Sequence, residues 1–364
     1  MNNLTYQSTG VDYSTMDPFK KAAQLAAVQT ASNMNRFGFE ELEWSRGESA
    51  YLFQTPIGIF AHVEEGLGTK NIVADNVSLF TGKSHYDQVS QCTIAMIVND
   101  MATLGALPVS LAMHLAVGVS GWFKNEQRTN DLVNGWKKAC DLARCNWGGG
   151  ETPTLKGIIV PGTVSLSGSG IGFAKKLIEP KVSDSDAIIL LQSSGIHANG
   201  LTLAREIADT STDGYMSILS DGTTYGESLL SPTNIYVGVI EDLINAGKTV
   251  NYAVNITGHG WRKLMRLKEP FTYRIKDLFP DMPIFNFIQK KGNVTDEEAY
   301  GNLNMGAGFA IYVPEHEAES IVEFVNKGGY GFNALNAGNI ETGPKQVVIE
   351  PKNLIFKAET LDVR

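Results

Sequence analysis

The sequence has little cysteine, no long apolar run and no excess of positive charge, and each absence excludes a class of protein. Three cysteines (Cys92, Cys140 and Cys145) are too few for a disulfide framework, so we expect a reducing cytoplasm as the setting. No apolar run approaches the ~20 residues of a membrane span, and the first residues lack the pattern of a signal peptide, so we expect no membrane partner. A formal charge of −9 at pH 7 argues against nucleic acid as a partner but does not exclude a nucleotide.

Both common phosphate-loop patterns are also missing, GxxxxGK(S/T) and GxGxxG after a strand. The chain instead has the stretch Glu64–Lys70, which directly follows an alternating apolar run that predicts a strand. Its glycines, Gly66 and Gly68, let backbone N–H groups approach a phosphate, and Lys70 adds a compact positive charge. The neighbouring carboxylates would repel phosphates unless a cation joined them. The stretch therefore predicts a Mg-nucleotide site, with a solvated hairpin turn as the alternative.

A predicted buried helix and a second glycine-rich loop carry further acidic side chains. Apolar residues recur at helical spacing across residues 87–104, which predicts a buried helix. Asp100 within it must be paired, hydrogen-bonded or metal-bound, because an isolated buried carboxylate is costly. The segment Trp147–Pro153 is predicted as a loop that carries Glu151. Its three successive glycines indicate that the backbone passes close to a ligand or to a neighbouring chain.

A third loop combines small polar residues with a histidine. The continuous apolar run Asp186–Gln192 predicts a strand buried on both faces, and Ser193–Gly200 follows it at the start of a helix. Free N–H groups and the helix dipole make such a loop an anion site. His197 in this loop is either a base or a hydrogen-bond partner of the loop itself.

Strands and helices alternate along both halves of the chain, which predicts an α/β or α+β fold with two domains of similar size. We also expect strands near residues 157–166 and 168–174, and a helix that starts at Ser231-Pro232 and ends near Ala246.

Residues 1–48 are predicted to be polar and irregular, apart from an alanine-rich helical stretch that begins near Lys20 and Lys21. They form either a disordered tail or a lid that becomes ordered around a ligand, with one of these two lysines facing its phosphates.

Taken in order, these loops resemble those of the aminoimidazole ribonucleotide synthetase family, also called phosphoribosylformylglycinamidine cyclo-ligases. No single motif decides this, but the ordered set makes coincidence improbable. The similar segments are Tyr6–Asp12, Glu65–Lys70, Ala95–Ala106, Gly148–Thr152, Ser193–Leu203, Tyr225–Val237, Asn255–Gly260 and Pro283–Met305.

The resemblance implies a two-domain fold and a homodimer whose N-terminal domains close a β-barrel. The ATP-binding and dimerisation domain would span residues 1–174, with residues 1–48 as a flexible lid, and the C-terminal domain would span 175–364. The implied reaction is closure of the imidazole ring of aminoimidazole ribonucleotide. ATP phosphorylates the formyl amide oxygen of formylglycinamidine ribonucleotide, a substrate nitrogen then attacks, and ADP and phosphate are released.

The resemblance also implies a role for each matched residue. Catalytic roles would fall to His197, Asp100 and Lys70, and Glu65 and Asp100 would hold Mg²⁺. The residues implied for ATP are Gly66, Gly68, Thr69, Lys70, Lys20, Lys21, Gly149 and Glu151. Those implied for the substrate are Ser194, Gly195, His197, Asn199, Gly200, Thr257 and Gly258.

Three departures from the family pattern leave other functions open. Glu65 stands where the family has aspartate, Cys92 replaces another aspartate, and Asn255 replaces a histidine, while His259 lies at a position that is normally glycine. The alternatives are an ATP-dependent enzyme of the same superfamily with a different acceptor, or a nucleotide-binding paralogue without turnover.

Overall fold

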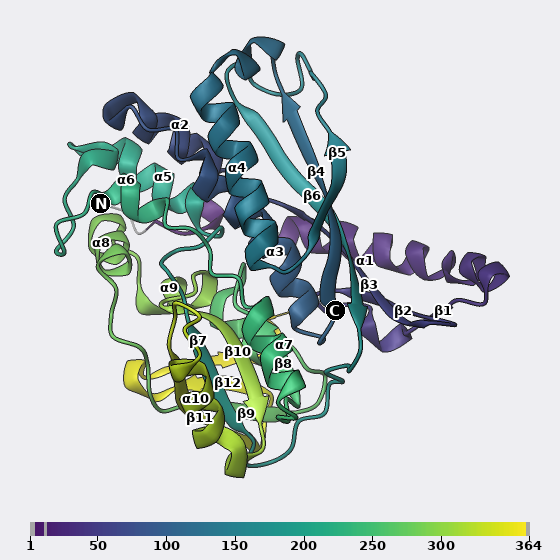
Figure 1. Cartoon of the computed structure of the whole chain (residues 1–364). Helices are drawn as coiled ribbons and strands as arrows, with labels where there is room; N and C mark the ends of the chain where they lie inside the picture. The colour runs from purple at the N-terminus through teal and green to yellow at the C-terminus, as the bar shows by residue number, and fades with distance from the viewer. Residues whose placement is uncertain (1–3, 11–12, 362–364) are drawn as a thin grey trace.

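Two mixed β-sheets organise the chain, one in each half (Figure 1). The computed structural model describes residues 4–10 and 13–361. Val11 and Asp12, which belong to the first family-like segment, lie outside the described residues. No helix in the described ranges is long and apolar enough to cross a membrane.

Among its described residues, the first half contains four α-helices and a six-stranded sheet. In chain order its elements are α1 (Tyr13–Val28), β1 (Glu40–Glu41), β2 (Tyr51–Thr55), β3 (Gly58–Gly66), α2 (Lys70–Thr81), α3 (Tyr86–Ala102), β4 (Leu107–Val117), α4 (Glu126–Leu142), β5 (Asn146–Glu151) and β6 (Val164–Ala174). The strand order is β1-β2-β3-β6-β4-β5. The predicted buried helix is confirmed as α3, which packs against β3, β4 and β6.

The segment predicted as a second glycine-rich loop is an edge strand, so that prediction was wrong. Residues 146–151 form β5, which pairs in parallel with β4. The expected close approach does occur, but to a neighbouring strand. A Cβ atom on Gly150 would lie 2.0 Å from the carbonyl oxygen of Met113, so only glycine allows this pairing. The strand predicted near 157–166 is also wrong, because Gly157 and Gly162 have positive φ and turn the chain until β6 begins.

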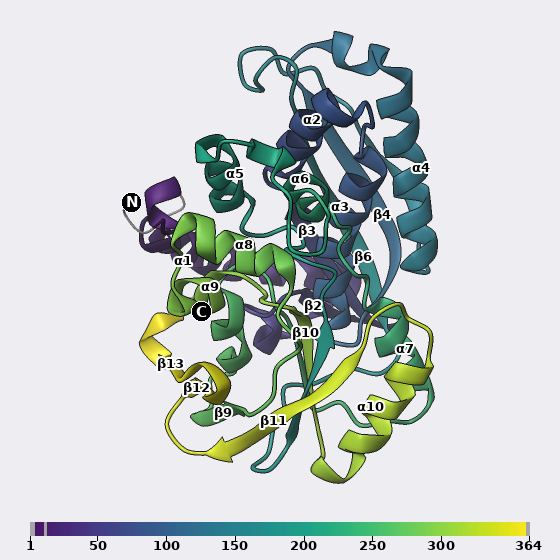
Figure 2. The same cartoon turned by 90° about the vertical axis from the view of Figure 1, so that its left-hand side faces the viewer.

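The second half contains a seven-stranded sheet in the order β13-β12-β9-β11-β7-β10-β8. Its elements are β7 (Ala187–Gln192), α5 (Leu201–Thr210), α6 (Tyr225–Leu229), α7 (Val237–Asn245), β8 (Tyr252–Asn255), β9 (Phe271–Ile275), α8 (Pro283–Gly292), α9 (Asp296–Asn302), β10 (Ala307–Val313), α10 (Ala318–Lys327), β11 (Ala334–Thr342), β12 (Gln346–Ile349) and β13 (Leu354–Lys357). The buried strand predicted from the run at 186–192 is confirmed as β7. Figure 2 shows α10 lying along β11 on one side of this sheet.

Polar side chains along α3 bind the backbone of residues 233–236 in the second half. Gln91 Nε2 donates to the carbonyl of Thr233 over 3.0 Å, and Asn99 Nδ2 donates to that of Asn234 over 2.8 Å. The Oδ1 atom of Asn99 accepts the Tyr236 N–H, also over 2.8 Å. These bonds explain why the helix predicted from Ser231-Pro232 begins only at Val237: its first backbone groups are satisfied by α3 instead.

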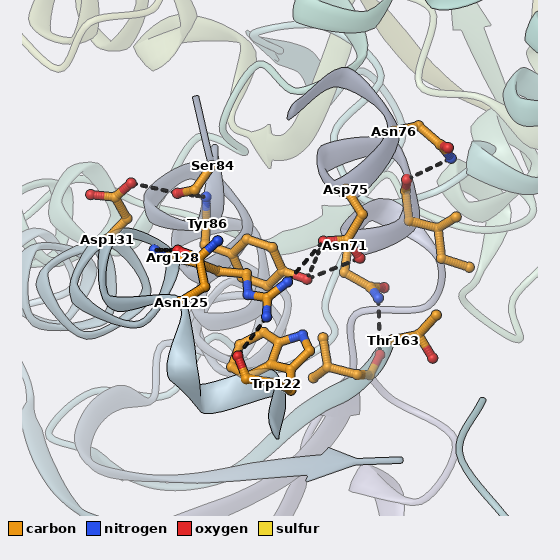
Figure 3. Close-up of polar contacts among 12 residues, drawn as sticks. Asn71, Asp75, Asn76, Ser84, Tyr86, Trp122, Asn125, Arg128, Asp131 and Thr163 are labelled. Atoms are coloured by element: carbon orange, nitrogen blue, oxygen red, sulfur yellow. Dashed lines mark hydrogen bonds and ion pairs between the residues drawn. The ribbon is translucent and has the colours of Figure 1, made fainter. Parts of the chain in front are cut away.

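A polar cluster fastens α2 to α3 and α4 (Figure 3). The Tyr86 hydroxyl donates to the carboxylate of Asp75 over 3.0 Å and 3.2 Å. The guanidinium of Arg128 lies 3.9 Å from the same carboxylate and 4.1 Å from the ring centre of Trp122. Burial raises the pKa of Asp75, and the Tyr86 hydrogen bond opposes that rise. The middle of α2 is therefore tied to the start of α3 and to α4.

The described N-terminal residues are packed on the second half, although we predicted them to be irregular. The Leu4 N–H donates to the carbonyl of Gly292 over 3.2 Å, and the Tyr6 N–H donates to Oε1 of Glu298 over 2.8 Å. From there α1 runs toward the first half, where Arg46 reaches the carbonyl of Ala27 over 3.5 Å. The segment thus joins the two halves.

Candidate active site

Two carboxylates from different elements of the first half face each other where the two halves meet. Glu65 lies near the end of β3, and Asp100 lies in the last turn of α3. Burial and the charge of Asp100 raise the pKa of Glu65 to about 7. Burial also raises the pKa of Asp100, against the opposing effect of Lys263. Both pKa values are raised because the two negative charges are buried close together. A bound cation would reduce the repulsion between them.

The second half supplies that pair with positive charge and a hydrogen bond. Asn255 at the end of β8 donates Nδ2 to Oδ1 of Asp100 over 2.8 Å. Lys263 donates to the Thr257 hydroxyl and, over 3.4 Å, to the carbonyl of Asn255. Burial lowers the pKa of Lys263 to about 8, while Asp100 and Glu65 favour its charged form. Asn255, at the position where the family has histidine, therefore serves to orient Asp100.

Arg266 closes the site from the side of residues 47–49. Its guanidinium donates to the carbonyl of Gly47 over 2.6 Å and 3.0 Å, and to the Ser49 hydroxyl over 2.8 Å. It lies 3.8 Å from the carboxylate of Glu48, which also accepts a 2.7 Å hydrogen bond from Tyr252. Ser49 in turn hydrogen-bonds Asp100.

The glycine turn after β8 brings α1 to the same place. His259 has φ of 70° and is buried. Burial lowers its pKa to about 3, with further lowering by Lys263, Arg262 and Lys20. Lys20 therefore lies within electrostatic range of His259, and its ammonium is 3.0 Å from Asp17. Of the two lysines predicted to face a ligand, Lys20 is the one whose charge acts on His259.

Lys70 occupies a different position from the one predicted for it. Its side chain is fully buried, and Nζ donates to the carbonyls of His197 and Ser231 over 2.8 Å and 2.7 Å. The thiol of Cys92 is its third neighbour. In this conformation the ammonium has no exposed surface with which to meet a phosphate, so Lys70 joins α2 to the loop before α5.

His197 also points into the protein rather than toward the carboxylates. Its Nε2 accepts the backbone N–H of Ser194 over 3.1 Å, and its φ is 61°. Burial and the charge of Lys70 lower its pKa to about 3, so the ring is neutral. Of the two roles left open for His197, this geometry favours the hydrogen-bond partner of the loop and does not support the base.

The remainder of the 193–200 loop is held by hydrogen bonds, and of its residues only Ser194 and Asn199 are partly exposed. Ser194 Oγ donates to the carbonyl of Pro232 over 2.5 Å, and Asn304 donates to that of Gly195 over 2.8 Å. Gly200 has φ of 87° and begins α5, while Asn199 is partly exposed. The loop is therefore a fixed platform beside the start of a helix.

Most of the stretch Glu64–Lys70 belongs to a strand or a helix, and its loop is short. β3 continues through Gly66, and α2 begins at Lys70, so only residues 67–69 connect the two. Gly68 has φ of 73°, and a Cβ atom built there would have nothing within 4 Å. Thr69 precedes the helix without capping it. These residues leave open space in front of the N-terminus of α2, where free N–H groups favour an anion.

The residues predicted on β5 lie in the same row of the sheet but away from the carboxylates. Gly66 pairs with Ser167, Ser167 with His114, and His114 with Glu151. Three interstrand steps separate Gly66 from Glu151, which is roughly 14 Å. The structure therefore brings together Glu65, Asp100 and Thr257, which all lie around Lys263, but not Glu151.

Lys263, Arg266, Glu48 and Ser49 were missed by sequence reasoning. The run of residues 261–266 does carry three basic side chains directly after the predicted glycine turn, which was the available signal. Within the described residues, no three His, Cys, Asp or Glu side chains converge on a ready-made metal site. The pair of carboxylates nevertheless fits Mg²⁺, because this ion is commonly held by one or two carboxylates together with phosphates.

Comparisons with known proteins identify relatives over most of the chain. The model for the N-terminal domain of AIR synthase related proteins matches residues 61–174, and that for the C-terminal domain matches residues 183–349. The chain is 35% identical over 331 residues to the phosphoribosylformylglycinamidine cyclo-ligase of Methanocaldococcus jannaschii, with 89% of each chain covered. It is 38% identical over 346 residues to the protein of that name from Methanococcus maripaludis, which covers 93% of this chain and 92% of the relative.

Solved structures agree at the level of the fold. A thiamine-monophosphate kinase from Stenotrophomonas maltophilia superposes with a TM-score of 0.58 at 14% identity, and the match covers 81% of this chain and 86% of that one. At this low identity, the match supports the two-domain α/β architecture and does not indicate a shared reaction.

Proposed function

Because the chain belongs to the phosphoribosylformylglycinamidine cyclo-ligase family of AIR synthase related proteins, we propose that it closes the imidazole ring of aminoimidazole ribonucleotide at the expense of ATP. The substrate is formylglycinamidine ribonucleotide, and the products besides the ring are ADP and phosphate. The observation that carries this proposal is identity of 35–38% to named cyclo-ligases over about nine-tenths of both chains.

The carboxylates of Glu65 and Asp100 would hold a Mg²⁺ ion that also binds the ATP phosphates. Such an ion supplies charge neutralisation at the transferred phosphoryl group. Asn255 and Ser49 keep the carboxylate of Asp100 in place, and Lys263 provides a fixed positive charge next to both acids. Preorganised charge of this kind is what phosphoryl transfer requires of a protein.

The phosphates would lie in the open space before α2, against the backbone of Gly66, Gly68 and Thr69. Lys20 of α1 would approach them from the other side as the lid lysine, in preference to Lys21, because Lys20 acts on His259 within the site. Lys70 would contribute indirectly, because its hydrogen bond to His197 fixes the 193–200 loop to α2.

The reacting end of the substrate would lie between the two halves. Ser194, Gly195, Asn199 and Gly200 would contact it at the start of α5. Thr257 and Gly258 would contact it from the turn beside Lys263. Gly149 and Glu151 would contact the far end of the nucleotide along the edge of the first sheet.

A cytoplasmic homodimer completes the proposal. The face of the first sheet opposite α3 leaves the side chains of His62, Glu64, Ser165 and Ile171 exposed. Residues 1–174 would form the ATP-binding and dimerisation domain, whose sheet pairs with a second copy to close a β-barrel. Residues 175–364 would form the C-terminal domain.

One assay separates this function from its alternatives. Purified protein is incubated with Mg-ATP and formylglycinamidine ribonucleotide, and aminoimidazole product and ADP are measured in parallel. We expect equal amounts of the two, and Asp100→Asn is the matched variant that should abolish both. ADP formed only with another acceptor would favour a different superfamily reaction. ATP binding without any turnover would favour a paralogue that only binds nucleotide.

A further inference from the structure

Two of the three cysteines meet at the end of α4, outside the proposed active site. The backbone there forms a complete Schellman motif. The Cys145 N–H donates to the carbonyl of Cys140 over 3.0 Å, and the Arg144 N–H donates to that of Asp141 over 3.1 Å. Arg144 has φ of 57°, the left-handed conformation that this motif requires. The motif brings together the side chains of its third-last helical residue and its second residue beyond the cap, which are Cys140 and Cys145.

The two side chains therefore lie at the same end of the motif, and they differ in exposure. Cys140 is buried, and Cys145 is partly exposed. The neighbouring Cys145 thiol lowers the pKa of Cys140, against the opposing effect of burial. A thiolate paired with a second thiol is the arrangement in which one sulfur reacts first and the other resolves it. Cys92, by contrast, is fully buried in α3, where its sulfur accepts the Thr233 N–H over 3.3 Å.

We propose that Cys140 and Cys145 are a redox-sensitive pair that forms a reversible intramolecular disulfide with peroxides. The Cys140 thiolate attacks one peroxide oxygen, hydroxide leaves, and Cys140 becomes a sulfenic acid. The Cys145 sulfur then attacks that of Cys140, a sulfur–sulfur bond forms, and water leaves. In total, two thiols and one hydrogen peroxide give one disulfide and two waters, and a thiol reductant reverses the change.

The disulfide would constrain the turn between α4 and β5, which also contacts α7. Cys145 directly precedes β5, so the disulfide fixes the entry to this edge strand. Arg144 within the bridged turn is already paired with Glu241 and Asp242 of α7, at 2.6 Å and 2.7 Å. The inference rests on the α4 turn alone and is independent of the proposed cyclo-ligase activity.

Peptide mapping of the full chain tests the proposal directly, because a trypsin site separates the two cysteines. The folded protein is treated with hydrogen peroxide, free thiols are blocked with N-ethylmaleimide, and trypsin is added without reductant. Cleavage after Lys138, Arg144 and Lys156 places the cysteines on separate peptides, residues 139–144 and 145–156. We expect these peptides to be joined after peroxide and to separate after dithiothreitol. Recovery of both peptides with blocked thiols would overturn the proposal.

Two cysteine variants identify which sulfur reacts with peroxide first. In Cys145→Ser the sulfenic acid has no resolving thiol, so dimedone should label Cys140 after peroxide treatment. In Cys140→Ser, dimedone labelling of the 145–156 peptide should fall several-fold below that level. Labelling at Cys92 instead of Cys140, or equal labelling in the two variants, would refute the assignment of Cys140 as the reacting sulfur.

Discussion

Replacing Glu65 with glutamine should make the free energy of unfolding less dependent on pH between about 4.5 and 7. In the folded protein, burial and the charge of Asp100 raise the pKa of Glu65 from 4.5 to about 7. The folded state therefore binds a proton that the unfolded state has already lost in this range. Stability consequently falls as the pH rises, and the loss is complete above pH 7. Glutamine cannot ionise, so the variant escapes this part of the loss.

The size of the effect follows from the difference between the two pKa values. A shift from 4.5 to about 7 corresponds to about 3 kcal/mol of unfolding free energy. This is an upper limit, because Glu65 is only partly buried and solvent screens its charge. Lys263 does not contribute to the slope in this range. Its pKa falls from 10.5 to about 8, so its effect on stability changes only above pH 8.

Urea unfolding from pH 5 to pH 8 in the presence of EDTA measures the effect, since a bound cation would stabilise the ionised pair. We expect the unfolding free energy of Glu65→Gln, relative to that of the wild-type protein, to increase by about 2–3 kcal/mol as the pH rises over this range. Glu64→Gln is the matched control, because it removes the same charge from the neighbouring exposed position. Parallel curves for the wild-type protein and Glu65→Gln would show that Glu65 and Asp100 do not interact as described.

Three further substitutions test the surroundings of the site by urea unfolding. Lys70→Met should lower the unfolding free energy by about 2–5 kcal/mol, because two buried carbonyls lose their donor; an unchanged midpoint would show that Lys70 is not the link described. Tyr86→Phe should cost about 1–3 kcal/mol through loss of the hydrogen bond to Asp75, and a cost near zero would contradict a structural role for that pair. Gly150→Ala should cost more than about 2 kcal/mol, because its Cβ would lie 2.0 Å from the Met113 carbonyl oxygen, and normal stability would mean that β5 does not pair with β4.

Much of the fold could be predicted because apolar patterns are local and continuous. The buried helix α3 and the buried strand β7 are both such patterns, and both were found. The edge strand β5 was missed because its glycines have no side chains from which to read alternation. Its pairing depends on the close approach to Met113, which only the folded structure reveals. The late start of α7 was missed for a related reason, since its first turn is replaced by bonds to α3.

The candidate site was only partly predictable, because the direction of a side chain depends on tertiary contacts. Glu65 and Asp100 do meet, as expected from their motifs. Lys70 and His197 belong to motifs of the same kind, yet both turn inward: Lys70 binds the carbonyl of His197, and the His197 ring accepts the N–H of Ser194 in its own loop. Nothing in the sequence distinguishes a lysine that faces a phosphate from one that faces two carbonyls. Lys263 was missed because its position beside the carboxylates depends on the turn at His259.

The row of polar side chains along α3 makes the two halves poor candidates for separate expression. If the chain were divided between β6 and β7, Gln91 and Asn99 would lose the backbone partners they now have at residues 233–236. Each fragment alone would also expose apolar side chains of the core that the two halves share, and it would tend to aggregate. Produced together, the fragments carry complementary hydrogen-bonding surfaces. The protein is thus suited to fragment complementation, in which formation of the folded protein reports that the two fragments have associated.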